Sequence, residues 1–466
     1  MSGARTPLLG QGPRRASNSA IMAPPPGPGE VRRTALPETF DGIRYEIGRM
    51  IKYVEAARQD PVMLANTDAI CRQYYQGLEH SAKMNGRTLA GADPRDICVN
   101  AIDAWCREHY VYVNDPPNIE VIQTPRRMVQ MTKIPPAVLG HLIEPFYEAM
   151  LAVADEASVR AYQPPPVCIG DCDEGGTLFL SHCAACRHAS FDQLLFDFGG
   201  HDESIHHVWS GVVIDGKHIA SDLTEPGYKL GDFSRFPHYE HVQITFDGRP
   251  TDLRGLGTQL GIAATSQSEA PPRKVISDAK IRRMAEKIAD YRKDALMVDT
   301  ARLVGVHYGK MVEHFSALEN RPVSAHNNKT LFLEGIDLWS RKTFSVAGRG
   351  APTTENPREV IAHVMRPWYE AMDLDDPSRY KLGRRPEKPR YVGSPEDLTC
   401  AMMGLAACLD ITPMNLAFGM DGEQPREAWA RVFADGNWYD SYVQGPEMVL
   451  GDRPDYSKVE EIEVPL

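Results

Sequence analysis

The sequence lacks any long apolar run, any excess of basic residues and any recognisable export signal. No stretch approaches the roughly 18–20 apolar residues of a membrane span, and the first residues contain no apolar signal core. Acidic residues outnumber basic ones by 63 to 51, for a formal net charge of −12. Because nucleic-acid binding needs clustered Lys and Arg to neutralise phosphates, we expect no nucleic-acid partner. Because an apolar run and an export signal are missing, we expect no membrane span and a cytoplasmic location.

Phosphate-binding loops and dinucleotide fingerprints are also missing, so no organic cofactor is predicted. Cysteine is scarce, with nine in 466 residues. Without an export signal these are expected to be mostly free thiols. Five are interpreted as small buried hydrophobic residues: Cys71, Cys98, Cys106, Cys400 and Cys408.

The chain begins with a segment that cannot form a core. Residues 1–36 are rich in Pro, Gly, Ser and Arg without apolar periodicity, which predicts a disordered arm. From about residue 38, apolar residues recur at spacings of three and four, which predicts helices. Further helices are expected at about 96–109, starting at Asp93-Pro94, and at about 137–157.

Strands are expected after these helices. Around residues 205–247 the apolar period shortens toward two, and Asp215-Gly216 is a hairpin-turn signal. Helices followed by antiparallel strands indicate the α+β class. Residues 264–275 are interpreted as a linker, and a second helical run begins near Asp278.

The second run repeats the first, which predicts two tandem domains at 37–263 and 276–466. Residues 102–105 return at 336–339, and residues 145–150 return at 367–372. A constant shift of 220 then relates Trp209 to Trp429, Asp215-Gly216 to Asp435-Gly436, Pro226 to Pro446, and Leu230-Gly231-Asp232 to Leu450-Gly451-Asp452.

One constellation in the first copy could carry chemistry. Cys172 is expected at a helix start, where backbone N–H groups favour a thiolate. His207 opens one strand and Asp222 ends the next, so the hairpin should bring the two together. An imidazole oriented by a carboxylate can activate a cysteine for nucleophilic attack.

The second copy has lost these groups. Glu427 stands opposite His207, Tyr442 opposite Asp222, and residues 393–397 contain no cysteine. Any catalytic chemistry is therefore expected in the first copy alone.

The strings Gly-Asp-Cys-Asp at 170–173, His-Val-Trp at 207–209 and Ser-Asp-Leu-Thr-Glu-Pro-Gly-Tyr at 221–228 resemble the transglutaminase-like superfamily of bacterial, archaeal and phage proteins. The resemblance covers about residues 165–235. It implies a papain-like Cys-His-Asp triad with Cys172 as nucleophile, His207 as base and Asp222 as its orienter. The family's His-x-Trp pattern selects His207 over the adjacent His206.

The resemblance further implies tandem transglutaminase-like domains, each a helical subdomain followed by a helix packed on an antiparallel sheet. The expected activity is that of a cysteine protease, amidase, deamidase or cross-linking transglutaminase. It would act on an amide bond of a protein or peptide substrate, and it needs no metal or organic cofactor. One departure from the family pattern is Gly175-Gly176, which predicts a late helix start or a displaced nucleophile.

Two other interpretations stay open. The first is a non-catalytic structural or assembly protein, such as a phage virion component located in the particle, whose 1–36 arm contacts neighbouring proteins. The second is a zinc-binding module built from Cys168, Cys172, Cys183 and Cys186 with His182 and His188. The zinc interpretation requires a break at Gly175-Gly176, because an unbroken helix separates Cys172 and Cys183 by about 16 Å.

Overall fold

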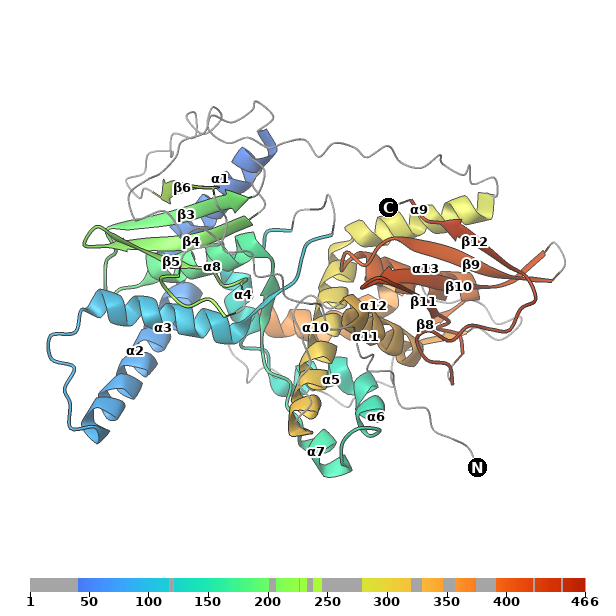
Figure 1. The fold of residues 1–466 in the computed structure, drawn as a ribbon, viewed down its shortest axis with the longest axis horizontal. Coiled ribbons are helices and arrows are strands. Elements are labelled where there is room, and N and C mark those ends of the chain that lie inside the picture. Colours follow the sequence, from blue (N-terminus) through green and yellow to red (C-terminus); the bar gives the residue numbers. More distant parts are fainter. Residues whose placement is uncertain are drawn as a thin grey trace, which may run out of the picture.

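The computed structural model describes residues 41–466 except 117–118, 120, 201–206, 226, 233–237, 245–278, 320–328, 347–356, 374–390, 422–423, 446 and 466. The predicted arm at 1–36 and the predicted linker at 264–275 lie outside the described residues. Figure 1 shows two halves with their larger sheets toward opposite ends and α5, α10 and α11 between them. None of the described helices is both long and apolar enough to cross a membrane.

The first half places most of its helices before its antiparallel strands. Its elements are α1 (Asp41–Ala57), α2 (Pro61–Met84), α3 (Pro94–His109), β1 (Tyr110–Tyr112), α4 (Pro125–Met131), α5 (Pro136–Ile143), the 3₁₀ helix η1 (Glu144–Phe146), α6 (Tyr147–Met150), α7 (Glu156–Ala161), β2 (Cys168–Gly170), α8 (Cys172–Ala185), β3 (Gln193–Gly200), β4 (His207–Ile214), β5 (Lys217–Ser221) and β6 (His238–Ile244).

The second half follows the same order. Its elements are α9 (Ala279–Lys293), α10 (Ala295–Leu318), α11 (Lys329–Thr343), β7 (Phe344–Val346), α12 (Pro357–Asp373), β8 (Tyr391–Gly393), α13 (Pro395–Ala407), β9 (Met414–Asp421), β10 (Gln424–Ala434), β11 (Asn437–Ser441) and β12 (Val459–Glu463).

Both halves contain a four-stranded antiparallel sheet of the same connectivity. The strand orders are β5-β4-β3-β6 and β11-β10-β9-β12. A short parallel pair also occurs in each half, β1 with β2 and β7 with β8. The chain is therefore of the predicted α+β class, with antiparallel sheets.

A buried polar contact recurs in both halves. Ser221 Oγ donates to Asp103 Oδ1 at 2.7 Å, and Ser441 Oγ donates to Asp337 Oδ1 at 2.6 Å. Each aspartate is also ion-paired to the arginine four residues later in its helix. These contacts tie α3 to the end of β5, and α11 to the end of β11, in the same way.

Two local predictions are confirmed. Asp93 caps α3 by accepting a hydrogen bond from Arg95 N at 2.8 Å, and Pro94 is the first helical residue, as the sequence signal predicts. The β4–β5 turn has φ values of 51° at Asp215 and 74° at Gly216, which suits the tight hairpin turn expected there.

The single helix expected at about 137–157 is wrong. The segment is divided into α5, η1 and α6, and α7 begins only at Glu156. Pro145 lies in the 3₁₀ turn between α5 and α6. The equivalent proline of the second half, Pro367, lies inside the continuous helix α12, so proline alone does not explain the division.

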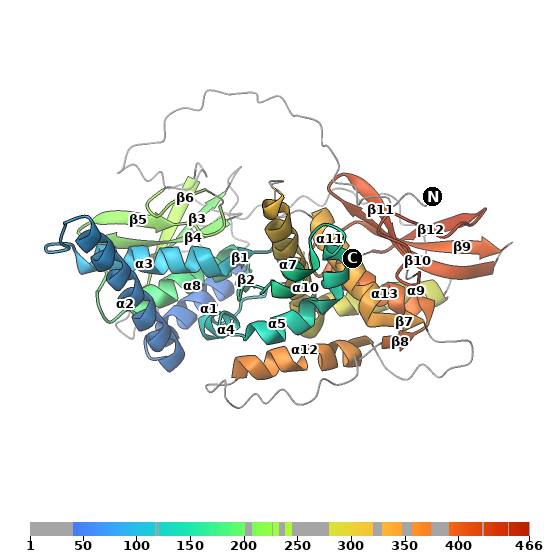
Figure 2. The same ribbon diagram turned by 90° about the horizontal axis from the view of Figure 1, so that it is seen from below.

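The two halves pack through helices that lie apart in the sequence. Figure 2 shows α12 passing along α4 and α5, and contacts join α12 to both. Arg127 of α4 pairs with Asp299 of α10 at 2.5 Å, and its guanidinium lies 5.9 Å from the ring centroid of Trp368 in α12. The second half is thus closely packed against the helices that support the first.

Candidate active site

Cys172 is the first residue of α8 and is partly exposed. A capping box holds this helix end: Asp171 Oδ1 accepts from Asp173 N at 3.2 Å, and Glu174 Oε2 accepts from Asp171 N at 2.7 Å. The late helix start expected from Gly175-Gly176 is therefore wrong. A Cβ at Gly175 would lie 3.2 Å from the ring of Tyr110, so glycine here permits close packing of α8 on β1.

His207 and Asp222 are brought together across the β4–β5 hairpin. His207 Nε2 lies 2.9 Å from Asp222 Oδ2, and both side chains are buried. Burial alone would raise the pKa of Asp222, but the hydrogen bond and charge of His207, with help from Thr224, hold this pKa below its usual value. Asp222 is thus an acceptor that orients the imidazole.

The Cys172 thiol lies beside the same strand. The backbone N–H of Val208, the residue that follows His207, acts to lower the pKa of this thiol. The ring of Trp209, also on β4, is nearly parallel to that of His207, with centroids 5.7 Å apart. Helix α8, which begins at Cys172, packs against β4, which begins at His207.

The electrostatics at Cys172 differ from the sequence expectation. Burial raises the pKa of the thiol well above its ordinary value, and the carboxylates of Asp171 and Asp173 raise it further. Asp173 Oδ1 accepts from the thiol at 3.4 Å, which also favours the protonated form. Burial and two neighbouring carboxylates thus outweigh the helix N-terminus, and the resting cysteine is a thiol.

We expect Asp173→Asn to shift the pH profile of Cys172 alkylation toward lower pH, because it removes a negative charge that opposes the thiolate. The measurement is the rate of iodoacetamide modification against pH, with the Cys172 peptide followed by mass spectrometry. Asp452→Asn, an exposed acidic position in the second half, is the control. An unchanged profile in Asp173→Asn would contradict the electrostatic argument.

Thr224 is a site residue for which the sequence analysis assigned no role. Its hydroxyl donates to Asp222 Oδ1 at 2.8 Å and lies 3.3 Å from His207 Nε2. Thr224 belongs to the string at 221–228 that carries the family resemblance. Its position two residues after Asp222, in the turn that follows β5, was the feature of the sequence that could have indicated a contact with Asp222.

A buried carboxyl close to Cys172, that of Glu174, was also missed in the sequence analysis. Glu174 is fully buried, and burial is the main cause that raises its pKa to about 8. Gln123 N and Gln123 Nε2 each donate to Glu174 Oε1 at 3.2 Å. These contacts hold the carboxyl that completes the capping box, two residues after Cys172.

The second half contributes a buried arginine to this region. Arg302 of α10 pairs with Asp115, and its guanidinium lies 4.0 Å from Glu174 Oε1. The Arg302 side chain is 3% exposed, and burial lowers its pKa to about 10. A residue of the second half thus helps to hold the start of α8 in the first half, and no local sequence pattern could reveal this contact.

The equivalent place in the second half is polar but has no nucleophile. Tyr442 OH donates to Glu427 Oε2 at 2.8 Å, where the first half has Asp222 and His207. Pro395 is the first residue of α13, in the position of Cys172 in α8. Gln444 Nε2 donates to Ala428 O at 2.5 Å and to Pro395 O at 3.4 Å, so it bridges β10 and the helix start.

The six-residue zinc set is not assembled. An unbroken α8 places Cys172 and Cys183 near opposite ends of the helix. Cys168 Sγ donates instead to His109 O at 3.3 Å, and His182 Nδ1 lies 2.8 Å from Thr67 Oγ1. The break at Gly175-Gly176 that this interpretation needed is absent from the helix, so the set as proposed is wrong.

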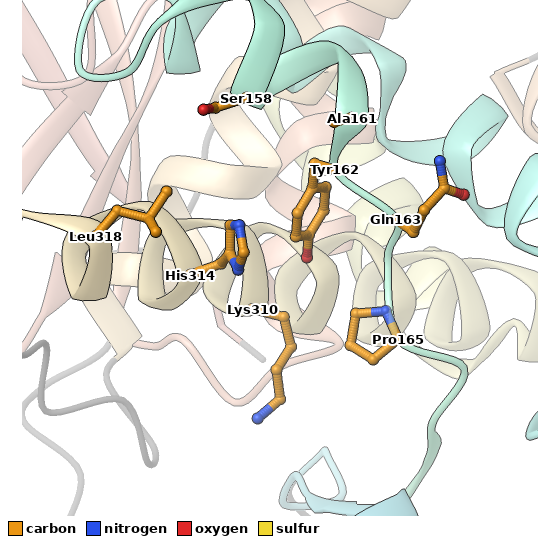
Figure 3. A pocket seen from close by; sticks show the side chains of 8 residues that line it. All are labelled: Ser158, Ala161, Tyr162, Gln163, Pro165, Lys310, His314 and Leu318. Atoms are coloured by element: carbon orange, nitrogen blue, oxygen red, sulfur yellow. The ribbon is translucent and has the colours of Figure 1, made fainter.

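A pocket of about 550 Å³ lies elsewhere, between the end of α7 and the last turns of α10. Figure 3 shows Tyr162 facing His314, and their ring centroids are 5.0 Å apart. The lining side chains also include Ser158, Gln163, Lys310 and Leu318. None of the three residues selected from the sequence lines this pocket.

Comparisons of the chain with protein-family models, with curated proteins and with solved structures found no match. The case for a function therefore depends on the side chains of this chain and their geometry.

Proposed function

We propose that the first half is a transglutaminase-like cysteine hydrolase or acyltransferase that acts on an amide bond of a protein or peptide. The observation that carries this proposal is the buried His207–Asp222 pair, 2.9 Å apart, with His207 on the strand against which the helix of Cys172 packs. In this proposal the two halves are tandem transglutaminase-like domains, the second of which has lost catalysis.

The chemistry follows from the thiol form of Cys172. As sulfur attacks the amide carbonyl, His207 accepts the thiol proton, and Asp222 stabilises the resulting imidazolium. Because His207 Nε2 faces Asp222, this proton transfer falls to Nδ1. The C–N bond then breaks, His207 returns the proton to the departing amine, and a thioester remains on Cys172.

The second step decides between hydrolysis and transfer. Water attack on the thioester gives a carboxylic acid, whereas attack by a primary amine gives a new amide. In either case His207 takes the proton of the attacking group and the Cys172 thiol is regenerated. Backbone N–H groups at the start of α8 carry partial positive charge that suits the developing oxyanion.

A second candidate function is a structural or assembly role for the same fold. Its supporting observation is the raised pKa of the Cys172 thiol, since an unactivated cysteine is a poor nucleophile at neutral pH. In the second half, the Glu427–Tyr442 and Gln444 hydrogen bonds occupy the equivalent place, so there these positions serve structural contacts.

The test is incubation of the full chain with casein and a fluorescent primary amine. We expect ammonia release, amine incorporation or peptide fragments, which identify deamidase, transglutaminase or protease activity respectively. Cys172→Ala should abolish the product, whereas Cys400→Ala, a buried thiol in α13, should not. Absence of all three products, together with no acylation of Cys172 by a reactive ester, would overturn the enzymatic proposal in favour of the structural one.

A further inference from the structure

Three cysteines distant in sequence meet at the C-terminal end of α8, opposite the end that carries Cys172. Cys71 lies in α2, Cys98 in α3, and Cys186 is the C-cap of α8. Their sulfur atoms all lie within 4.8 Å of one another. Cys71 and Cys98 are buried and Cys186 is partly exposed, so the cluster borders on solvent on one side. The proposed catalysis uses none of them.

The cluster lies at the edge of the hydrophobic core. Cys71 and Cys98 belong to the buried core, and Cys186 packs against it. Three thiols gathered from three helices offer three of the donors that a tetrahedral zinc site needs.

His188 is the candidate for a fourth donor, but its ring nitrogens are not among the atoms that lie within 4.8 Å of one another, so its side chain would have to turn toward the sulfur atoms to bind the same ion. It follows Cys186 by two residues, and its Nε2 lies 2.8 Å from Asp68 Oδ1. Asp68 is on α2, one turn before Cys71. A metal-binding imidazole commonly gives its other nitrogen to a carboxylate, and the His188–Asp68 pair has this form.

The second half provides an internal comparison. Gly305 occupies in α10 the place of Cys71 in α2, the eleventh residue of a helix of 24. Phe332 precedes Asp337 by five residues, as Cys98 precedes Asp103. A Cβ at Gly305 would lie 3.3 Å from Phe332 Cγ, so an aromatic ring fills this space.

The third neighbour in the second half is also apolar: Leu409 Cδ1 would lie 3.1 Å from a Cβ at Gly305. The adjacent Cys408, the C-cap of α13, donates its thiol to the carbonyl of Tyr291 at 3.7 Å instead. Apolar packing thus suffices to join these helices, which indicates that the three thiols of the first half serve another purpose.

We propose that Cys71, Cys98, Cys186 and His188 bind one Zn²⁺ ion. Thiolates and imidazole are the donors that zinc prefers in structural sites. Tetrahedral Zn–S bonds of about 2.3 Å place sulfur atoms about 3.8 Å apart, which a cluster within 4.8 Å accommodates. The ion would join α2, α3 and the end of α8, and it would stabilise the helix that carries Cys172 at its other end.

The test is metal binding by the full chain, purified with reductant and freed of metal by chelation. We expect one Zn²⁺ per chain, release of protons as the cysteine thiols ionise, and a Co²⁺ derivative with sulfur-to-metal charge-transfer absorption. Cys71→Ser should abolish stoichiometric binding, and Cys400→Ser should leave it unchanged. Asp68→Ala should weaken binding by about 10–100-fold, as loss of a carboxylate behind a metal-bound histidine does.

Several outcomes would overturn the proposal. Unchanged zinc binding in Cys71→Ser would do so, as would a disulfide between two of the three cysteines in the freshly reduced and desalted protein. An unaltered affinity in His188→Ala would overturn the assignment of the fourth ligand. The cobalt spectrum uses the unmodified chain, so the test does not depend on whether a cysteine variant folds.

Discussion

Replacement of His207 by alanine is expected to slow acylation of Cys172 by about 10²–10⁴-fold, the usual contribution of a positioned general base. The reason is that burial and the carboxylates of Asp171 and Asp173 hold Cys172 as a thiol, so sulfur needs a base at the moment of attack. The measurement is release of p-nitrophenolate from p-nitrophenyl acetate in a single turnover, with the acetyl group located on Cys172 by mass spectrometry.

The second half offers a matched control for this experiment. Glu427→Ala alters the position equivalent to His207 and breaks the contact to Tyr442, but it touches no nucleophile. We expect its acylation rate to equal that of the unmodified chain. Asp222→Asn should fall between the two, because the imidazole remains but loses its orienting charge. Equal rates in His207→Ala and Glu427→Ala would contradict the proposed role of His207.

Replacement of Arg302 by methionine is expected to lower the free energy of unfolding by about 3–5 kcal/mol, the usual effect of removing one partner of a buried ion pair. The change leaves the Asp115 carboxylate, 9% exposed, without its guanidinium partner. It also removes the cation 4.0 Å from Glu174, which caps the helix of Cys172. Urea denaturation followed by circular dichroism measures the change in midpoint.

An exposed ion pair in the second half is the control, because its loss removes an arginine charge without leaving a buried carboxylate unpaired. Arg426 and Asp421 lie 2.7 Å apart with side chains 59% and 63% exposed, and Arg426→Met should change stability by less than about 1 kcal/mol. Asp115→Asn combined with Arg302→Met should recover part of the loss, since no uncompensated carboxylate then remains. Equal effects of Arg302→Met and Arg426→Met would show that Arg302 is not the buried support described above.

The local parts of the fold were predictable because their causes are local. Asp93 caps α3 through the backbone N–H two residues later, and Asp215-Gly216 turns the hairpin because both residues adopt positive φ. The hairpin in turn brings His207 to Asp222, since strand pairing places residues on either side of a turn next to each other. The division of the segment 137–157 into shorter helices was missed because apolar spacing alone indicated a continuous helix.

The sequence by itself determined the α+β class, the repeated order of elements, and which cysteine, histidine and aspartate could form a site. Only the tertiary structure decided that Arg302 of the second half reaches the capping box of α8, and that Cys71, Cys98 and Cys186 converge. It also showed that burial and the carboxylates of Asp171 and Asp173 raise the pKa of the Cys172 thiol. Burial and long-range contacts depend on which helix faces pack together, and residues separated by 27 to 128 positions leave no local spacing pattern in the chain.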